Sequence, residues 1–132
     1  MRIAKQLSVM LTNQPGRLAF LCGKLSAARV DIKAISVIES TEQAIVRMIV
    51  DKTAAARKAV MNADLPHSVT EVLFIEVADK PGTLARIAND LSKATVNIQY
   101  IYGSSGPGGR EAMLVVGVDD INRAKKVFAV LS

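Results

Sequence analysis

Apolar residues fall on every second position in some stretches of the chain and recur at helical spacing in others. Leu7, Val9 and Leu11 show the two-residue period of a strand with one buried face. A helical pattern follows this strand, with apolar positions at Leu18, Leu21, Cys22 and Leu25. The pattern predicts a strand, a tight turn at Pro15-Gly16 and a helix.

The first half of the chain continues with three more strands and one more helix. Runs rich in β-branched residues predict strands over 31–39 and 43–50, and a last strand is expected over 67–71. A helix is predicted over 53–62, with Asp51 as its N-cap. Its inner face is expected to consist of Ala56, Ala59, Val60 and Ala63.

The second half of the chain repeats the first. Asn13-Gln14-Pro15-Gly16 returns 66 positions later as Asp79-Lys80-Pro81-Gly82, and the offset becomes 68 after two extra residues in the glycine-rich turn 103–109. The repeat predicts strands over 72–78, 97–102 and 111–118 and a helix over 82–93, followed by a final helix. The inward residues of these two helices are expected to be Leu84, Ile87, Ala88 and Leu91, and then Ile121, Ala124, Phe128 and Leu131.

This order of elements predicts an α+β fold of two tandem ferredoxin-like βαββαβ modules. Each module is an antiparallel sheet with both helices on one face. The predicted boundaries are 1–71 and 72–132. The second module lacks its last strand, so we expect an open edge or groove there.

Composition and charge narrow the class of protein. The chain is 50% hydrophobic, has one cysteine, and contains no apolar run near the roughly 20 residues that span a membrane. Its start lacks a secretory signal, so we expect a cytoplasmic protein with no membrane partner. The net charge is +5, but the basic residues are scattered and aromatic residues make up only 4%. These features favour a solvated basic surface over nucleic-acid binding.

The residues that usually carry catalysis are isolated in the sequence. Cys22 falls on an apolar helix stripe, His67 has no helical partner for a metal, and Asp119-Asp120 has the position of a helix cap. No nucleotide-binding glycine motif is present. We therefore expect no enzyme activity, metal or cofactor. The remote alternatives are an acylphosphatase-like enzyme and a nucleic-acid-binding ferredoxin-like domain.

The repeated Pro-Gly turn has the chemistry of an anion site. Gly16 and Gly82 let a ligand approach the backbone, and the first N–H groups of the following helix are unpaired donors. A carboxylate there gains several charge-assisted hydrogen bonds. The competing interpretation is a tight turn without a ligand, and the repetition favours the anion site.

The residues around this turn resemble the ACT domain, a small-molecule-binding regulatory module. Each copy has Asn or Asp, then Pro-Gly, then Leu as the second residue after the glycine, and later Val-Asp-Ile or Val-Asn-Ile at the next strand. The resemblance covers nearly the whole chain as two tandem copies. It implies a ligand at an interface, between the turn of one module and the second-strand start of its neighbour.

The resemblance implies two unequal sites. Amides at Asn13 and Asn97 can serve both groups of an amino acid, whereas Asp79 and Asp31 place two carboxylates around one pocket. Tyr100 is expected to form a wall for the ligand side chain, and Arg17 either binds the ligand carboxylate or faces solvent. The principal ligand-binding residues are expected to be Asn13, Gln14, Gly16, Arg17, Leu18, Asn97, Ile98, Gln99 and Tyr100. The second, weaker site is expected to consist of Asp79, Gly82, Thr83, Leu84, Asp31 and Ile32.

The function implied by the resemblance is regulation by a free amino acid or a similar small zwitterion. Exposed sheet edges and small modules lead us to expect a homodimer, with a biosynthetic enzyme as a further partner. The alternative is a ligand-free interaction or scaffold subunit, since sheet edges can dock without a ligand.

Overall fold

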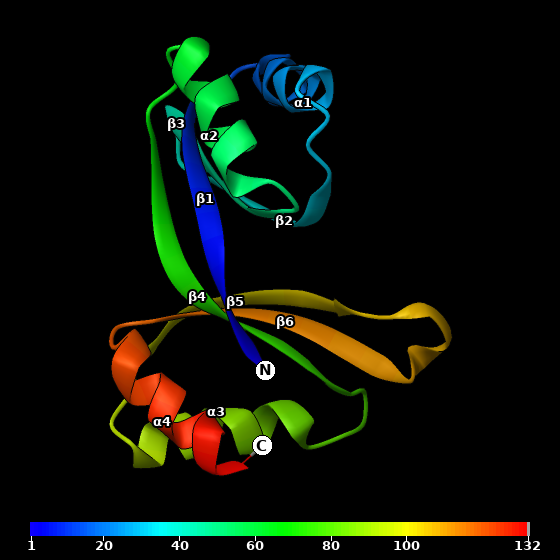
Figure 1. Cartoon of the computed structure of the whole chain (residues 1–132), viewed down its shortest axis with the longest axis vertical. Helices are drawn as coiled ribbons and strands as arrows, with labels where there is room; N and C mark the ends of the chain where they lie inside the picture. The colour runs from blue at the N-terminus through cyan, green and yellow to red at the C-terminus, as the bar shows by residue number, and fades with distance from the viewer. Residues whose placement is uncertain (132) are drawn as a thin grey trace. The chain divides into compact units, whose positions relative to one another are not determined.

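A computed structural model describes residues 1–131 of the 132-residue chain. The order of elements matches the predicted repeat (Figure 1). No helix among the described residues is long and apolar enough to cross a membrane. The elements are β1 (Arg2–Thr12), α1 (Arg17–Ala27), β2 (Ile32–Glu39), β3 (Gln43–Val50), α2 (Thr53–Asn62), β4 (His67–Ala78), α3 (Thr83–Lys93), β5 (Ile98–Ser105), η1 (Pro107–Gly109), β6 (Glu111–Val118) and α4 (Ile121–Leu131).

The chain forms two compact units, which we call the first unit (Lys5–Thr70) and the second unit (Met1–Ala4 with Glu71–Ser132). β1 and β4 each contribute residues to both units, because each is longer than the strands predicted from the repeat. The predicted strands 67–71 and 72–78 are therefore one continuous strand.

The first unit is a sheet in the order β2-β3-β1-β4, with β3 antiparallel to both β2 and β1. Helices α1 and α2 lie on one face of these strands (Figure 1). The predicted inner face of α2 is confirmed, since Ala56 and Val60 are fully buried and Ala59 and Ala63 pack against the same core. The buried core consists of Leu7, Val9, Leu11, Leu21, Leu25, Val30, Val46, Met48, Val50, Ala56, Val60 and Leu65.

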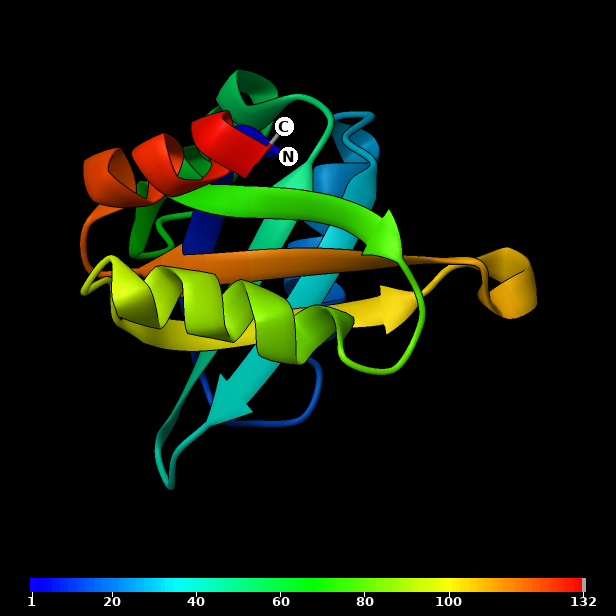
Figure 2. The same cartoon turned by 90° about the horizontal axis from the view of Figure 1, so that it is seen from below.

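The second unit repeats this arrangement with β4, β6 and β5 in that order and antiparallel to their neighbours. Figure 2 shows α3 and α4 on the same side of these strands. Ala124 and Phe128 of α4 are buried as predicted, whereas the side chain of Leu131 lies outside the described part. The buried core consists of Leu73, Ile75, Ile87, Leu91, Val96, Val116, Ala124 and Phe128.

The fourth strand position of the second unit is occupied by the beginning of β1. The residues Met1–Ala4 belong to this unit, and β1 is the sheet neighbour of β4. Ile3 packs against the core, and the Arg2 guanidinium lies 4.5 Å from the centre of the Phe74 ring. The expectation of an open edge is corrected here, because the sequence pattern showed no strand after the last helix but could not show that the N-terminus takes its place.

Candidate functional site

The two Pro-Gly turns have the same backbone geometry. Gly16 and Gly82 adopt left-handed φ angles of 85° and 90° and stand at the N-caps of α1 and α3. A Cβ at either glycine would meet no atom within 4 Å, so conformation and not crowding requires glycine there. Neither helix has a side-chain cap or an acidic residue in its first turn. Each helix therefore presents its positive end at the turn. The first N–H groups are not all unpaired as expected, because those of Arg17 and Thr83 donate to the carbonyl oxygens of Gln14 and Lys80 at 3.4 and 3.3 Å.

The residues that begin the turns, Asn13 and Asp79, are each held by their own unit. The Asn13 amide nitrogen donates to Glu39 Oε2 at 3.2 Å and to the carbonyl oxygen of Ser40 at 3.0 Å. The Asp79 carboxylate accepts from the hydroxyl of Ser105, which lies at the position of Glu39 in the repeat. The first residue of the turn is the donor in the first copy and the acceptor in the second, and it contacts the same position of the repeat in both.

The second strand of each unit begins with a matched pair of hydrogen bonds. The backbone N–H of Asp31 donates to Asp51 Oδ1, and that of Asn97 donates to Asp119 Oδ1, both at 2.9 Å. The N–H groups of Asp51 and Asp119 donate back to the carbonyl oxygens of Asp31 and Asn97, at 3.0 and 3.1 Å. The prediction of Asp51 as the N-cap of α2 is wrong, because this carboxylate is used by the strand and Lys52 stands at the cap.

A register irregularity follows in both second strands, between Ile32 and Ala34 and between Ile98 and Tyr100. The bulged residues are Lys33 and Gln99, which occupy the same position of the repeat. Lys33 Nζ contacts Asp31 Oδ2 at 2.8 Å, and this hydrogen bond lowers the pKa of the Asp31 carboxyl below its usual value. This ion pair, which was not predicted, reduces the negative field of Asp31.

Arg17 follows the first turn and lies back over its own helix. Its guanidinium carbon is 5.0 Å from the centre of the Phe20 ring. Its Nε is buried and has no hydrogen-bond partner among the described residues. The matching residue Thr83 instead donates its hydroxyl to the carbonyl oxygen of Ala78 at 3.1 Å. Arg17 therefore keeps a donor beside the turn, whereas Thr83 does not.

Tyr100 is held against its own sheet. Its cross-strand partner is Gly117, where a Cβ would lie 2.2 Å from Tyr100 Cζ. Only glycine leaves room for the ring. The role of Gly117 was not predicted, although a glycine inside the apolar run 114–118 indicates a close approach to the backbone.

The apolar helix stripes are not buried along their whole length. Leu18 and Leu84 are 40% and 49% exposed, so the prediction that Leu84 faces inward is wrong. They lie in the first turn of their helices, and Leu21 and Ile87, which follow them, reach the core. The repeat also exposes Ile35 and Ile101, at 43% and 37%.

Two hollows border the predicted residues of the first unit. One, of about 480 Å³, is lined by Asn13 and Gln14 together with 41–43. The other, of about 400 Å³, lies at Asp31 and Ile32 beside the C-terminal half of α1. Neither of these two hollows is lined by both the turn and the second-strand start of the unit.

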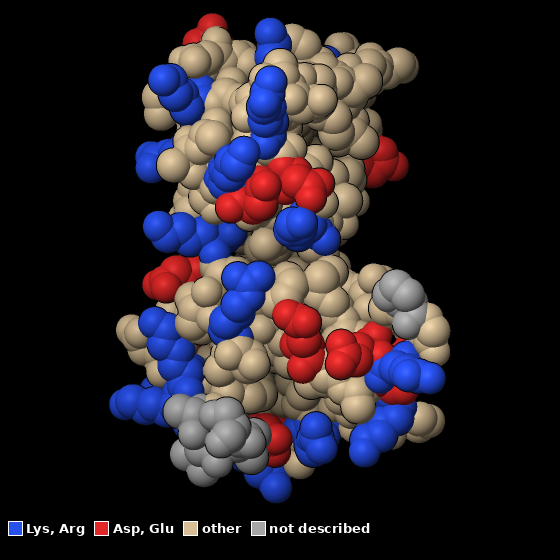
Figure 3. Space-filling model, turned by 45° about the vertical axis from the view of Figure 1, so that its right-hand side comes forward, with Lys and Arg blue, Asp and Glu red and all other residues tan. Residues whose placement is uncertain are grey.

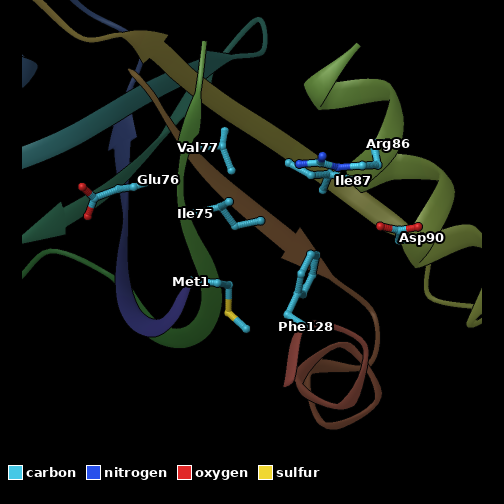
Figure 4. A pocket seen from close by; sticks show the side chains of 8 residues that line it. All are labelled: Met1, Ile75, Glu76, Val77, Arg86, Ile87, Asp90 and Phe128. Carbon is cyan, nitrogen blue, oxygen red and sulfur yellow. The ribbon is translucent and has the colours of Figure 1, made fainter. Parts of the chain in front are cut away.

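A further hollow in the second unit was not predicted. It measures about 310 Å³, and none of the predicted ligand-binding residues lines it. Figure 4 shows Ile75, Ile87 and Phe128 at this hollow, with Arg86 and Asp90 projecting from α3. Its apolar walls are core residues, and Met1 lies at its edge.

The described residues include no group of three or more His, Cys, Asp or Glu side chains able to hold a metal ion. His67 Nδ1 lies 3.0 Å from the carbonyl oxygen of Leu65, and Cys22 is half-buried. Asp120 Oδ1 accepts from the backbone N–H of Arg123, as expected of a helix cap. Figure 3 shows basic side chains next to one another in several places on the visible face.

Comparison with known proteins gives a family and a fold. The crystal structure of protein BT0572 from Bacteroides thetaiotaomicron is similar, with a TM-score of 0.91 and 28% identity over 96% of this chain and 87% of that one. The ligand-free regulatory subunit of aspartate kinase from Thermus thermophilus has the same fold, with a TM-score of 0.68 and 14% identity over 98% and 96% of the two chains. The corresponding subunit from Thermus flavus has a TM-score of 0.64 and 13% identity, over 100% of this chain and 98% of that one.

A search of curated proteins found no match. The family model described as an ACT domain pair matches residues 1–131, which is all of the chain that the structure describes. The chain belongs to the family of ACT domain pairs.

Proposed function

We propose that this ACT domain pair is a regulatory protein that binds a free amino acid. The observation that carries the proposal is the open turn at Gly16, where a left-handed glycine leads into a helix with no side-chain cap and no acid in its first turn. A ligand carboxylate at these N–H groups gains charge-assisted bonds of about 1.5–3 kcal/mol each. Three or four such contacts offset the cost of binding and suffice for a micromolar Kd, about 8 kcal/mol.

The principal site of the proposal combines the first turn with the second-strand start of the other module. The amide nitrogen of Asn13 donates to Glu39 and Ser40, which leaves its Oδ1 to accept a hydrogen bond from the ligand ammonium. Arg17 directly follows Gly16 and brings a guanidinium charge beside the turn for the ligand carboxylate. The principal residues are Asn13, Gln14, Gly16, Arg17 and Leu18, with Asn97, Ile98, Gln99 and Tyr100 from the same chain or from a second copy.

The second site of the proposal is weaker. Its turn offers the Asp79 carboxylate, and the Thr83 hydroxyl is already bonded to Ala78. Asp79 repels a ligand carboxylate, and the carboxylate of Asp31 faces Lys33. This site comprises Asp79, Gly82, Thr83 and Leu84 with Asp31 and Ile32.

Regulation in this proposal works through assembly. β2 and β5 are edge strands, and each exposes an isoleucine at the same position, Ile35 and Ile101. Such edges pair with another copy or with a partner protein. We propose a cytoplasmic homodimer that controls an enzyme of amino-acid metabolism and is itself not an enzyme. Two similar folds, from Thermus species, are regulatory subunits of aspartate kinase, which supports this type of role.

A thermal-shift screen against the twenty amino acids tests the proposal. An amino acid at 100 times its Kd stabilises the folded state by about 2.7 kcal/mol, which raises Tm by about 10 °C. Asn13→Ala is expected to remove this shift because it deletes the acceptor for the ammonium. Asn62→Ala, at an exposed position of α2 outside both proposed amino-acid sites, is the matched control that keeps it. If none of the twenty raises Tm, the ligand-free scaffold is the better description.

A further inference from the structure

A basic hollow lies between α2 and the neighbouring strands of the first unit. It measures about 380 Å³, and three residues with cationic side chains line it, Lys5 from β1 and Arg57 and Lys58 from α2. No Asp or Glu is among the described residues that line it, and none of the three cations forms an ion pair with a described residue. The rest of the lining is Thr53, Ala54, Met61 and Val69.

The second unit shows what the repeat places at the same position. Glu71 is the counterpart of Lys5, at the offset of 66, and Lys125 is the counterpart of Arg57, at the offset of 68. Lys125 Nζ lies 3.9 Å from Glu71 Oε2. At the position of this acid the first unit has Lys5. Three residues of like charge therefore line one hollow.

A second exchange of the same kind occurs at the start of the helix. Asp120 caps α4 by accepting from the backbone N–H of Arg123 at 2.9 Å. Its counterpart at the start of α2 is Lys52, which makes no side-chain cap and donates its Nζ to the carbonyl oxygen of Arg29. Two carboxylates of the second unit, Glu71 and Asp120, thus have lysines as their counterparts in the first, Lys5 and Lys52.

We propose that this hollow binds a small organic phosphate as its dianion. The phosphate supplies the negative charge that Glu71 supplies at this position of the second unit, and it contacts Lys5, Arg57 and Lys58. Met61, which is 53% exposed, and Val69 provide an apolar surface for the organic part. The site uses none of the residues of the amino-acid site, so it adds a second class of ligand to the protein.

Titration with phenyl phosphate at low ionic strength tests this site, with the affinity measured by calorimetry on the full chain. We expect phenyl phosphate to bind at least about tenfold more tightly than inorganic phosphate, because only phenyl phosphate reaches Met61 and Val69. Lys5→Glu restores the acid of the second unit and is expected to weaken binding about tenfold or more. Lys93→Glu changes the net charge equally at an exposed position of α3 and is expected to leave the affinity within about twofold.

Four outcomes would overturn the proposal. These are no binding of phenyl phosphate at 10 mM, equal losses in Lys5→Glu and Lys93→Glu, an affinity no better than that of inorganic phosphate, and tighter binding of a short oligoglutamate peptide. Arg57→Gln keeps the test valid if Lys5→Glu does not fold, since Arg57 is exposed on α2 and its replacement is also expected to weaken binding.

Discussion

Individual residues of this chain are often explained by their counterparts in the other copy. Asn13 and Asp79 make the same contact with opposite hydrogen-bond roles, and Lys33 and Gln99 occupy the same bulge. These contacts join residues 26 positions apart in sequence, which the alternating pattern does not pair. The motif could therefore be predicted from the sequence, but not the partners of its side chains.

The residue Thr95 follows α3 with a left-handed φ of 60°. A β-branched residue in this region costs about 1–2 kcal/mol, and glycine has no such cost but loses more backbone entropy on folding. Thr95→Gly is therefore expected to raise the free energy of unfolding by about 0.5–1 kcal/mol, measured by urea denaturation. Ser92→Gly, in the same helix at helical φ, is expected to lower it by about as much. A loss of stability in Thr95→Gly would contradict the strain argument.

The ion pair of Asp31 and Lys33 predicts a pH-dependent effect. The hydrogen bond and charge of Lys33 lower the pKa of Asp31, so the pair stabilises the fold above the unfolded pKa of about 3.9 and stops doing so as the pH falls through the folded value. Lys33→Gln, which copies Gln99, is expected to raise the pKa of Asp31 toward its ordinary value. An NMR titration of the Asp31 carboxyl checks this, and an unchanged midpoint would rule out Lys33 as the cause.

At the scale of elements, an aspartate in each unit joins the end of the third strand to the start of the second strand by a hydrogen bond. The carboxylates of Asp51 and Asp119 accept from the backbone N–H groups of Asp31 and Asn97. From the sequence, an aspartate just before a helix indicates an N-cap. The sheet register decides otherwise, because it brings the strand N–H groups within 2.9 Å.

Removing this contact in the second unit has a defined cost. Asp119→Ala leaves the N–H of Asn97 without its acceptor and is expected to lower the free energy of unfolding by about 0.5–1.5 kcal/mol. Asp119→Asn keeps a side-chain oxygen acceptor and is expected to lose less than half of that. Hydrogen exchange of the Asn97 amide reports on the bond directly. Equal protection in wild type and Asp119→Ala would show that this contact is not formed in solution.

At the scale of the whole molecule, the edge strands carry the prediction for assembly. Ile35 lies on β2, which stands at one edge of the sheet, and its side chain is 43% exposed. Ile35→Lys is expected to weaken the proposed homodimer at least about tenfold, because a lysine on an edge strand opposes pairing. Analytical ultracentrifugation measures the change. Met61→Lys, at another exposed apolar position, is the control and should leave the dimer unchanged.

The sequence by itself determined the repeat, the order of the elements and the position of the turns. Periodicity and turn chemistry are local, and both copies carry them with the same offset. Only the tertiary structure showed that the beginning of β1 occupies the fourth strand position of the second unit. It also placed Leu18 and Leu84 at the surface and the carboxylates of Asp51 and Asp119 on strand N–H groups. These outcomes depend on long-range pairing between segments, which a local pattern of residues does not encode.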